Sequence, residues 1–327
     1  MTVPTWLRRL SPDPYVVAIL LMVALASVVP ARGAMADGLG VVTKLAIGLL
    51  FFLHGAKLSR EAVVGGMTHW RLHLLVIAST FVLFPLLGLA ARRLPGFVLS
   101  DSLSAGVLFL CCLPSTVQSS IAFTSVARGN VAASICAASA SNLLGIVVTP
   151  LLGGLLLGTH GGGNPLGAIG AVAVQLFLPF AAGQIARPAV RGWMGRHGKL
   201  VSYVDRGSIL LVVYGAFSAA VTGGLWTKVS GVQVLALAGV CAVLLAIVLA
   251  ATLFASRALG FSKADEIAIV FCGSKKSLAS GVPMASILFP APMVGILVLP
   301  LMIFHQLQLM ACALIAQHWA ARPIEEA

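Results

Sequence analysis

The sequence predicts an all-α polytopic membrane protein with ten transmembrane helices, arranged as two inverted five-helix repeats. Three observations lead to this fold class. The chain of 327 residues is 59% hydrophobic and only 9% charged, whereas soluble domains carry about 25% charged residues. Apolar runs of ~20 residues, the length that crosses a bilayer, follow one another at short intervals. A glycine-rich link near the midpoint leaves five runs on each side.

The ten apolar runs are interpreted as helices whose ends are approximate. The link occupies residues 158–165, so the first repeat covers 1–158 and the second covers 165–327. An odd number of helices in each repeat inverts the second repeat relative to the first. In chain order, the expected helices cover residues 15–30, 40–56, 72–91, 103–126, 131–157, 166–186, 208–223, 232–254, 267–289 and 293–319.

The basic residues lie in the short segments between these runs. A net charge of +12 would suggest nucleic acid as a partner of a soluble protein. Here few aromatic residues accompany the bases, so nucleic acid is excluded and the lipid bilayer is the expected partner. With the N-terminus in the cytoplasm, most of the 21 lysine and arginine residues fall on the inner side. This predicts an inner-membrane, multi-pass protein with both termini cytoplasmic, and it leaves the oligomeric state open.

The fourth run is interrupted by Pro114 and a cluster of polar residues. Proline removes a backbone donor and breaks the helix, and backbone groups freed at membrane depth must be satisfied or line a cavity. The alternative is a packed, kinked helix whose serines bond neighbouring helices. The length of the cluster favours a binding site made of Ser115, Thr116, Gln118, Ser119 and Ser120.

The ninth run is interrupted by Ser274, Lys275, Lys276 and Ser277. A lysine at the bilayer centre costs about 3 kcal/mol, so such residues are functional by default. The alternative is a shorter helix with the lysines in a loop, but residues 267–273 would then be too few to cross the membrane. Interruptions at corresponding places in two repeats are the best sequence indication of a transporter's binding site.

The fifth and tenth runs carry further polar residues that we expect to face these interruptions. The candidate residues for substrate binding are Ser115, Thr116, Gln118, Ser119, Ser274, Lys275, Lys276, Ser277, His305 and Gln306. The candidate residues for an ion or coupling site are Ser119, Ser120, Ser134, Ser139, Asn142, Lys275 and Lys276.

Enzymatic chemistry finds little support in the sequence. None of the nine acidic residues lies at mid-span, and no nucleophile–base set, metal-ligand spacing or nucleotide loop appears. We therefore expect no catalytic residues, no metal centre and no cofactor.

At the two interruptions the sequence resembles the bile acid:sodium symporter family, in particular its divergent SBF-like branch. The resemblance extends over nearly the whole chain. It is most specific in the segments 114–130, 149–150, 272–283 and 304–306. It implies that broken helices 4 and 9 cross each other. It also implies a core domain of helices 3–5 and 8–10, at about 72–158 and 231–319, which moves against a panel domain of helices 1, 2, 6 and 7.

The sequence departs from the family pattern where well-studied members bind sodium. Phe271 stands where those members have a glutamate, and Lys275-Lys276 replace a Gln-Asn pair. Ser134 fits a hydroxyl position of the fifth helix, while Ala138 lacks one. Lysine ammoniums donate the hydrogen bonds that a bound cation would otherwise satisfy. We therefore predict that one of the lysines replaces at least one sodium ion. The alternative is that the lysines only bind substrate and that one sodium site survives around Ser119, Ser120 and Ser134.

These observations predict a secondary active transporter of a small organic anion that works by alternating access. A monovalent-cation or proton antiporter on the same fold is the first alternative. The second is a regulatory membrane protein that binds a ligand without moving it. The identity of the solute, the direction of transport, the coupling ion (sodium, protons or neither) and which lysine faces the cavity stay open at this stage.

Overall fold

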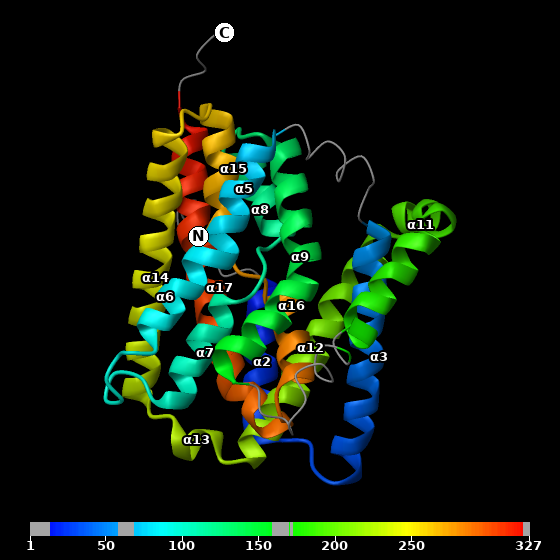
Figure 1. Ribbon diagram of the computed structural model, residues 1–327. Helices are drawn as coiled ribbons and strands as arrows, with labels where there is room; N and C mark the ends of the chain where they lie inside the picture. Colours follow the sequence, from blue (N-terminus) through cyan, green and yellow to red (C-terminus); the bar gives the residue numbers. More distant parts are fainter. Residues whose placement is uncertain (1–13, 58–68, 159–169, 171–172, 323–327) are drawn as a thin grey trace, which may run out of the picture.

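A computed structural model of the chain describes residues 14–57, 69–158, 170 and 173–322. That part of the chain is helical and contains no β-strand; Figure 1 shows the helices packed side by side as one bundle. The two termini and most of the glycine-rich link predicted at 158–165 lie outside the described residues, and so do the basic residues at the N-terminus.

The described helices follow the order of the predicted runs. Their bounds are α2 Pro14–Val28, α3 Ala34–Lys57, α5 Trp70–Ala78, η2 Ser79–Leu83, α6 Phe84–Ala91, α7 Asp101–Cys111, α8 Gln118–Val126, α9 Val131–Leu157, η3 Ala173–Phe177, α11 Leu178–Arg196, α12 Gly198–Thr222, α13 Leu225–Lys228, α14 Gly231–Ala258, α15 Lys263–Gly273, α16 Leu278–Leu288 and α17 Ala291–Ala320.

Six of these helices are long and apolar enough to cross a membrane. They are α3, the continuous stretch Trp70–Ala91, α9, α12, α14 and α17. The other predicted spans correspond to α2, to the segment containing α11, and to the pairs α7/α8 and α15/α16. Each of these is short, interrupted or rich in basic residues, so length and composition do not identify it as a span. The predicted total of ten spans and the inverted repeat stay predictions.

Both predicted interruptions lie at helix ends. α7 ends at Cys111 and α8 begins at Gln118, with Pro114 in the intervening segment. α15 ends at Gly273 and α16 begins at Leu278, so both lysines are in the break. Pro283 lies inside α16 and does not end it. The break therefore follows the polar residues rather than the proline.

The largest difference from the predicted bounds concerns the basic segment before the seventh run. The sequence predicts a loop over residues 187–207, but α11 continues to Arg196 and α12 begins at Gly198. When helices are predicted from continuous apolar runs, only the part of each helix that is hydrophobic on all sides is found. The polar ends of α11 and α12 are amphipathic and continue the same helices.

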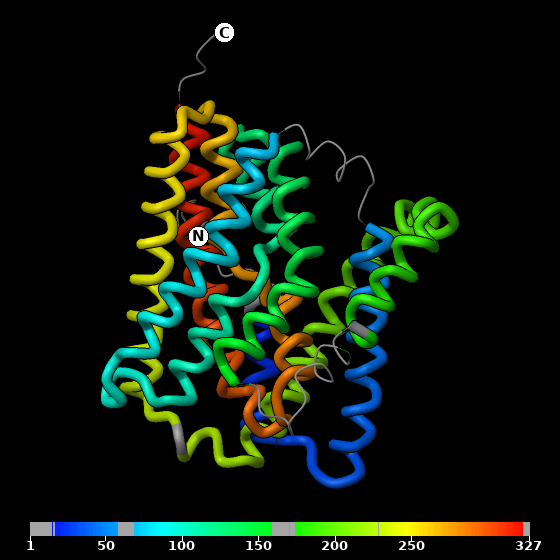
Figure 2. The backbone as a smooth tube through the Cα atoms, in the orientation of Figure 1, coloured from blue at the N-terminus to red at the C-terminus, as the bar shows by residue number. Residues whose placement is uncertain are grey.

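Helices α2, α3 and α11 each pack on α12, and α3 also packs on α11, while α5 to α9 and α14 to α17 make up most of the remaining helices. Figure 2 shows α3 and α11 standing apart from the helices around α14 and α15. α12 connects the two groups, because it packs on α2 and α3 and also on α16 and α17.

The contact between α3 and α11 depends on two glycines. A Cβ on Gly55 would collide with the main chain of Phe180, and a Cβ on Gly183 would collide with the main chain of Phe52. Small residues at matching positions allow two helix backbones to approach closely in a membrane, where dispersion contacts drive helix association.

The positive-inside rule generates a testable topology. Reporter fusions after Ala327 and within the link at 158–165 are expected to lie on opposite sides of the membrane, with Ala327 in the cytoplasm. A cytoplasmic fluorescent protein and a periplasmic phosphatase at each place provide the measurement. If both fusions report the same side, the ten-span model is wrong.

Candidate functional site

The two helix breaks are in direct contact. The Ser277 backbone N–H donates to the Pro114 carbonyl at 2.9 Å, and the Ser115 hydroxyl donates to the Cys272 carbonyl at 2.5 Å. Segments more than 150 residues apart in the sequence thus share hydrogen bonds, and every partner in these bonds is buried or lies at the break.

The end of α15 is capped by side-chain hydroxyls. The last carbonyls of a helix have no partner within the helix, and water is scarce at membrane depth. Ser120 donates to the Phe271 carbonyl at 2.9 Å, and Ser79 donates to the Gly273 carbonyl at 2.8 Å. Together with the Ser115 bond to Cys272, these hydroxyls satisfy three successive carbonyls.

The end of α7 is capped by an ammonium. Lys276 Nζ donates to the carbonyls of Cys111 at 2.8 Å, Leu113 at 2.7 Å and Thr80 at 2.9 Å. Its ammonium also lies 4.1 Å from the centre of the Phe84 ring. A helix C-terminus carries partial negative charge that favours a cation. Lys276 Nζ therefore lies among carbonyl oxygens, which are the acceptors that also suit a bound monovalent cation.

Lys275 has a different environment from its neighbour. Both lysines are fully buried, at 0% exposure. The Lys275 ammonium lies 4.3 Å from the centre of the Phe123 ring and 5.1 Å from that of Phe271. No described residue accepts a hydrogen bond from it. The two adjacent ammoniums thus have different surroundings. That of Lys276 has three hydrogen-bond acceptors, and that of Lys275 lies against aromatic rings.

Two amide side chains hold the breaks in register. Asn142 of α9 donates to the Ser115 carbonyl at 2.7 Å and accepts from the Ser280 hydroxyl at 2.8 Å, so it touches both breaks. Gln308 of α17 accepts from the Lys276 N–H at 2.8 Å and donates to the Lys276 carbonyl at 2.9 Å. Gln308 is absent from the residues that the sequence indicates for substrate or ion binding, although it lies one helical turn from His305.

A cluster of hydroxyls lies beside the α15 cap. Thr116 shares hydrogen bonds with Ser119 at 2.7 Å and with Ser120 at 3.0 Å. Thr124 donates to Ser134 at 3.1 Å. The structure therefore brings Ser119, Ser120 and Ser134 close together, as the surviving-sodium alternative requires, although none of the described carboxylates joins them.

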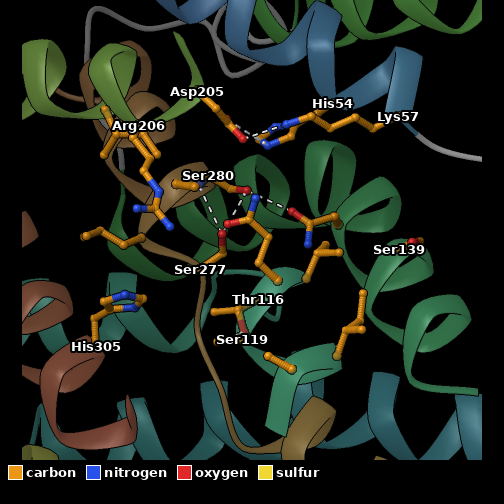
Figure 3. Close-up of a pocket in the computed structure, with 18 of the residues that line it drawn as sticks. His54, Lys57, Thr116, Ser119, Ser139, Asp205, Arg206, Ser277, Ser280 and His305 are labelled. Carbon is orange, nitrogen blue, oxygen red and sulfur yellow. Dashed lines mark hydrogen bonds and ion pairs between the residues drawn. The ribbon is translucent and has the colours of Figure 1, made fainter. Parts of the chain in front are cut away.

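A cavity of about 620 Å³ lies between the breaks and helices α3 and α12. The first turns of α8 and α16 both border it, through Gln118 and Ser119 and through Ser277 to Ser280. Figure 3 shows Thr116 and Ser119 on one side of this cavity, and Asp205, His54 and Lys57 on the other. Of the sequence-predicted residues, those that line the cavity are Thr116, Gln118, Ser119, Ser139, Asn142, Ser277 and His305.

The other predicted residues lie behind the cavity wall. Ser115, Ser120, Ser134, Ser274, Lys275 and Lys276 are buried, and Gln306 is not among the described residues that line the cavity. Ser274 bonds within its own helix, to the Val270 carbonyl at 2.6 Å. A role in binding stays a prediction for all of these residues.

A charged group on α3 and α12 was not anticipated from the sequence as part of the site. Lys57 Nζ lies 2.7 Å from Asp205 Oδ2, and His54 Nε2 lies 3.5 Å from Asp205 Oδ1. These residues and Arg206 line the cavity opposite the breaks. The sequence shows Lys57 and Asp205 only as charges near predicted loops, 148 positions apart, and nothing in its periodicity pairs them.

The contrast between the two lysines generates a prediction about stability. Lys276→Met keeps the volume but leaves three buried carbonyls without a donor, and we expect a loss of roughly 2–3 kcal/mol. Lys275→Met removes a buried charge that has no acceptor, and such replacements are neutral or stabilising. Thermal unfolding of the purified variants in one detergent provides the measurement. Equal losses for the two variants would contradict the assignment of the lysines.

Comparisons with known proteins agree with the resemblance seen at the breaks. The model of the SBF-like CPA transporter family matches residues 13–321. The uncharacterized protein PA2026 of Pseudomonas aeruginosa is 57% identical, over 96% of this chain and 95% of its own length. The putative symporter YfeH of Escherichia coli is 53% identical, over 94% and 92%. Sodium/bile acid cotransporter 7 of Xenopus tropicalis is 29% identical, over 93% and 90%. The chain belongs to the SBF-like CPA transporter family.

Proposed function

We propose that the protein is a secondary active transporter of a small organic anion that works by alternating access. The observation that carries this proposal is the convergence of two helix N-termini, those of α8 and α16, on one cavity. Helix N-termini present free N–H groups and partial positive charge, and both favour an anion. No carboxylate among the described residues lies at either break.

The other cavity walls suit the organic part of such a solute. Apolar side chains, among them Phe51, Phe180, Ile146 and Ile209, line much of the surface. On the far side, the positive charges of Lys57 and Arg206 outnumber the single negative charge of Asp205. Mostly apolar pockets with a few fixed polar groups are typical of organic ligand sites.

The proposal includes a particular architecture. Ten spans in two inverted repeats, with both termini in the cytoplasm of an inner membrane, would place the breaks of α7/α8 and α15/α16 at mid-depth. The core would comprise the helices that make the breaks, and the panel would comprise α2, α3, α11 and α12. The packing of α3 on α11 and α12, away from most of the core helices, supports this division.

The names of the relatives bear on coupling. One is called a putative symporter and others are called sodium/bile acid cotransporters. We propose that one sodium ion binds at the hydroxyl cluster of Thr116, Ser119, Ser120 and Ser134. We also propose that Lys276 takes the place of a second cation, because its ammonium occupies a set of main-chain oxygens that would otherwise attract one.

The antiporter alternative has one observation in its favour. Asp205 is a buried carboxylate at the cavity wall, and carboxylates carry cations and protons in transporters. Its partner Lys57 already neutralises it at 2.7 Å. The regulator alternative predicts that a solute binds but is not exchanged across a membrane. The proposal and its two alternatives therefore predict different results in the experiments below.

The anion proposal predicts charge-selective stabilisation. Purified protein is screened by thermal unfolding against pairs of carboxylates or sulfonates and their neutral amides, and only the anions are expected to raise the melting temperature. The best anion is then used for counterflow in proteoliposomes. Stabilisation by cations or amides alone would contradict the proposal, and stabilisation without counterflow would favour the regulator.

The site assignment adds a matched pair of variants to this screen. Ser119→Leu fills the cavity beside the first turn of α8 and is expected to abolish anion stabilisation. Ser125→Leu adds the same volume on the exposed face of α8, outside the residues that line the cavity. It is expected to bind as the unchanged protein does. Equal effects of the two variants would exclude the cavity as the binding site.

The replacement of a cation by Lys276 predicts a new sodium requirement. Lys276→Gln leaves the three carbonyl oxygens free and adds an amide oxygen, which together form oxygen ligands for a cation. We expect its melting temperature to rise with sodium chloride relative to choline chloride more steeply than that of the unchanged protein. Lys275→Gln, which frees no carbonyl, is the control. A cooperative two-ion sodium dependence in the unchanged protein would contradict the proposal.

A further inference from the structure

Lys275 is a buried side chain with no role in the features described so far. It neither joins the two breaks, as Lys276 does, nor lines the cavity. Its Nζ is fully buried and has no hydrogen-bond acceptor among the described residues. The ring faces of Phe123 and Phe271 lie beside it, with their centres 4.3 Å and 5.1 Å from Nζ. No acidic side chain in the described part of the chain forms an ion pair with it.

The aromatic rings compensate only part of the cost of this burial. A cation over an aromatic ring gains an attraction that is weaker than that of a hydrogen-bonded ion pair. Removing an ammonium from water costs several kcal/mol even after the protein relaxes. The neighbouring Lys276 shows what full compensation requires, namely three carbonyl acceptors within 2.9 Å. Lys275 thus has unused capacity to bind a negatively charged group.

Phe123 contacts both this ammonium and the cavity. The ring of Phe123 covers the Lys275 Nζ, and Phe123 also lines the cavity. It lies just over one turn from the start of α8 at Gln118, so the free N–H groups of that helix end are close to it. Rotation of the Phe123 ring would therefore expose the ammonium to the same space that the two helix N-termini border.

The main chain at Lys275 is fixed, which leaves its side chain free for this role. Gln308 holds the next residue, Lys276, through both of its backbone groups, and Lys276 itself is anchored at its ammonium. A movement of the Phe123 side chain would thus expose the Lys275 ammonium and leave the hydrogen bonds between the two breaks intact.

We propose that Lys275 is a closed anion subsite, gated by Phe123, that accepts the carboxylate or sulfonate group of the solute when the ring moves aside. This deepens the transport function proposed above and assigns different tasks to the two lysines. Lys276 holds the breaks together permanently, and Lys275 binds charge only in the open state. The apolar part of the solute would remain in the cavity, beside Ile121 and Leu143.

Amine labelling tests the gate without knowledge of the natural solute. The full chain in lipid nanodiscs is treated with formaldehyde and dimethylamine–borane, and methylation of each lysine is measured by peptide mass spectrometry. In the unchanged protein we expect Lys275 and Lys276 to react far more slowly than the exposed Lys199. Phe123→Ala is expected to raise the rate at Lys275 by about tenfold, equivalent to a 1.4 kcal/mol lower opening free energy, and to leave Lys276 unchanged.

Two controls separate a gate from a general loosening of the structure. Ile121→Ala removes a side chain from the same helix and the same cavity wall, and it should not change labelling of Lys275. Phe123→Leu keeps apolar volume but removes the ring, and it should give an intermediate rate if Phe123→Ala does not fold. A rise at Lys276 equal to that at Lys275, or no rise at Lys275 in a folded variant, would overturn the gate.

The charge preference is tested on Phe123→Ala with a matched pair of probes. Benzenesulfonate is expected to protect Lys275 from methylation, compared with the same concentration of sodium chloride, and neutral benzenesulfonamide is expected to give no protection. Equal protection by both probes, or by neither, would overturn the anion subsite. Because labelling does not depend on transport, a failure of counterflow with intact protection would reject the transport function and keep the subsite.

Discussion

The constraint on which this structure depends is that two helices, α7 and α15, end in the buried interior and leave carbonyl groups that need donors from elsewhere in the fold. At the end of α15 the donors are the hydroxyls of Ser79, Ser115 and Ser120. At the end of α7 the donor is the ammonium of Lys276. Each break is thus completed by side chains from outside its own helix, and several of these side chains come from the other break. The crossing therefore forms as one unit.

The choice of donor has an electrostatic consequence. Hydroxyls cap a helix end without adding charge, whereas Lys276 adds a full positive charge that no described carboxylate neutralises. Lys275 adds a second, and the two helix N-termini at the cavity have the same sign. An anion would meet attraction in this space, and a cation would bind there only where fixed oxygen atoms, such as those of the hydroxyl cluster, offset the repulsion. The same residue that stabilises the crossing thus also biases the cavity toward anions, and this explains how the fold can function without an acidic residue at the breaks.

The sequence predicts the breaks well and the surroundings of the breaks poorly. Pro114 and the lysine pair are visible as violations of an apolar pattern, because polar groups at mid-span stand out against their neighbours. Asp205 and Lys57 lie at helix ends, where charges are ordinary, so only the fold reveals that they pair at the cavity. The sequence also does not predict that α12 begins as early as Gly198, because the first turns of this helix are amphipathic rather than wholly apolar. Lys275 and Lys276 are chemically identical. Only the directions of their side chains decide that Lys276 binds three carbonyls and that Lys275 has no acceptor among the described residues.

The hydrogen bonds of the crossing also limit which movements are compatible with transport. The hydrogen bonds that join the two breaks run between η2, the end of α7, α8, α9, α15, α16 and α17. Among the described residues, none of these bonds involves α2, α3, α11 or α12. A movement of the second group relative to the first would therefore leave the crossing intact. The contacts that would change include those of α12 with α16 and α17, among them the place where Gly295 lies against Ala220. Small side chains present shallow surfaces that slide past one another with little steric obstruction. The hydrogen bonds of the crossing and the helices of the opposite cavity wall thus belong to different parts of the fold, and the alternating access proposed above requires this separation.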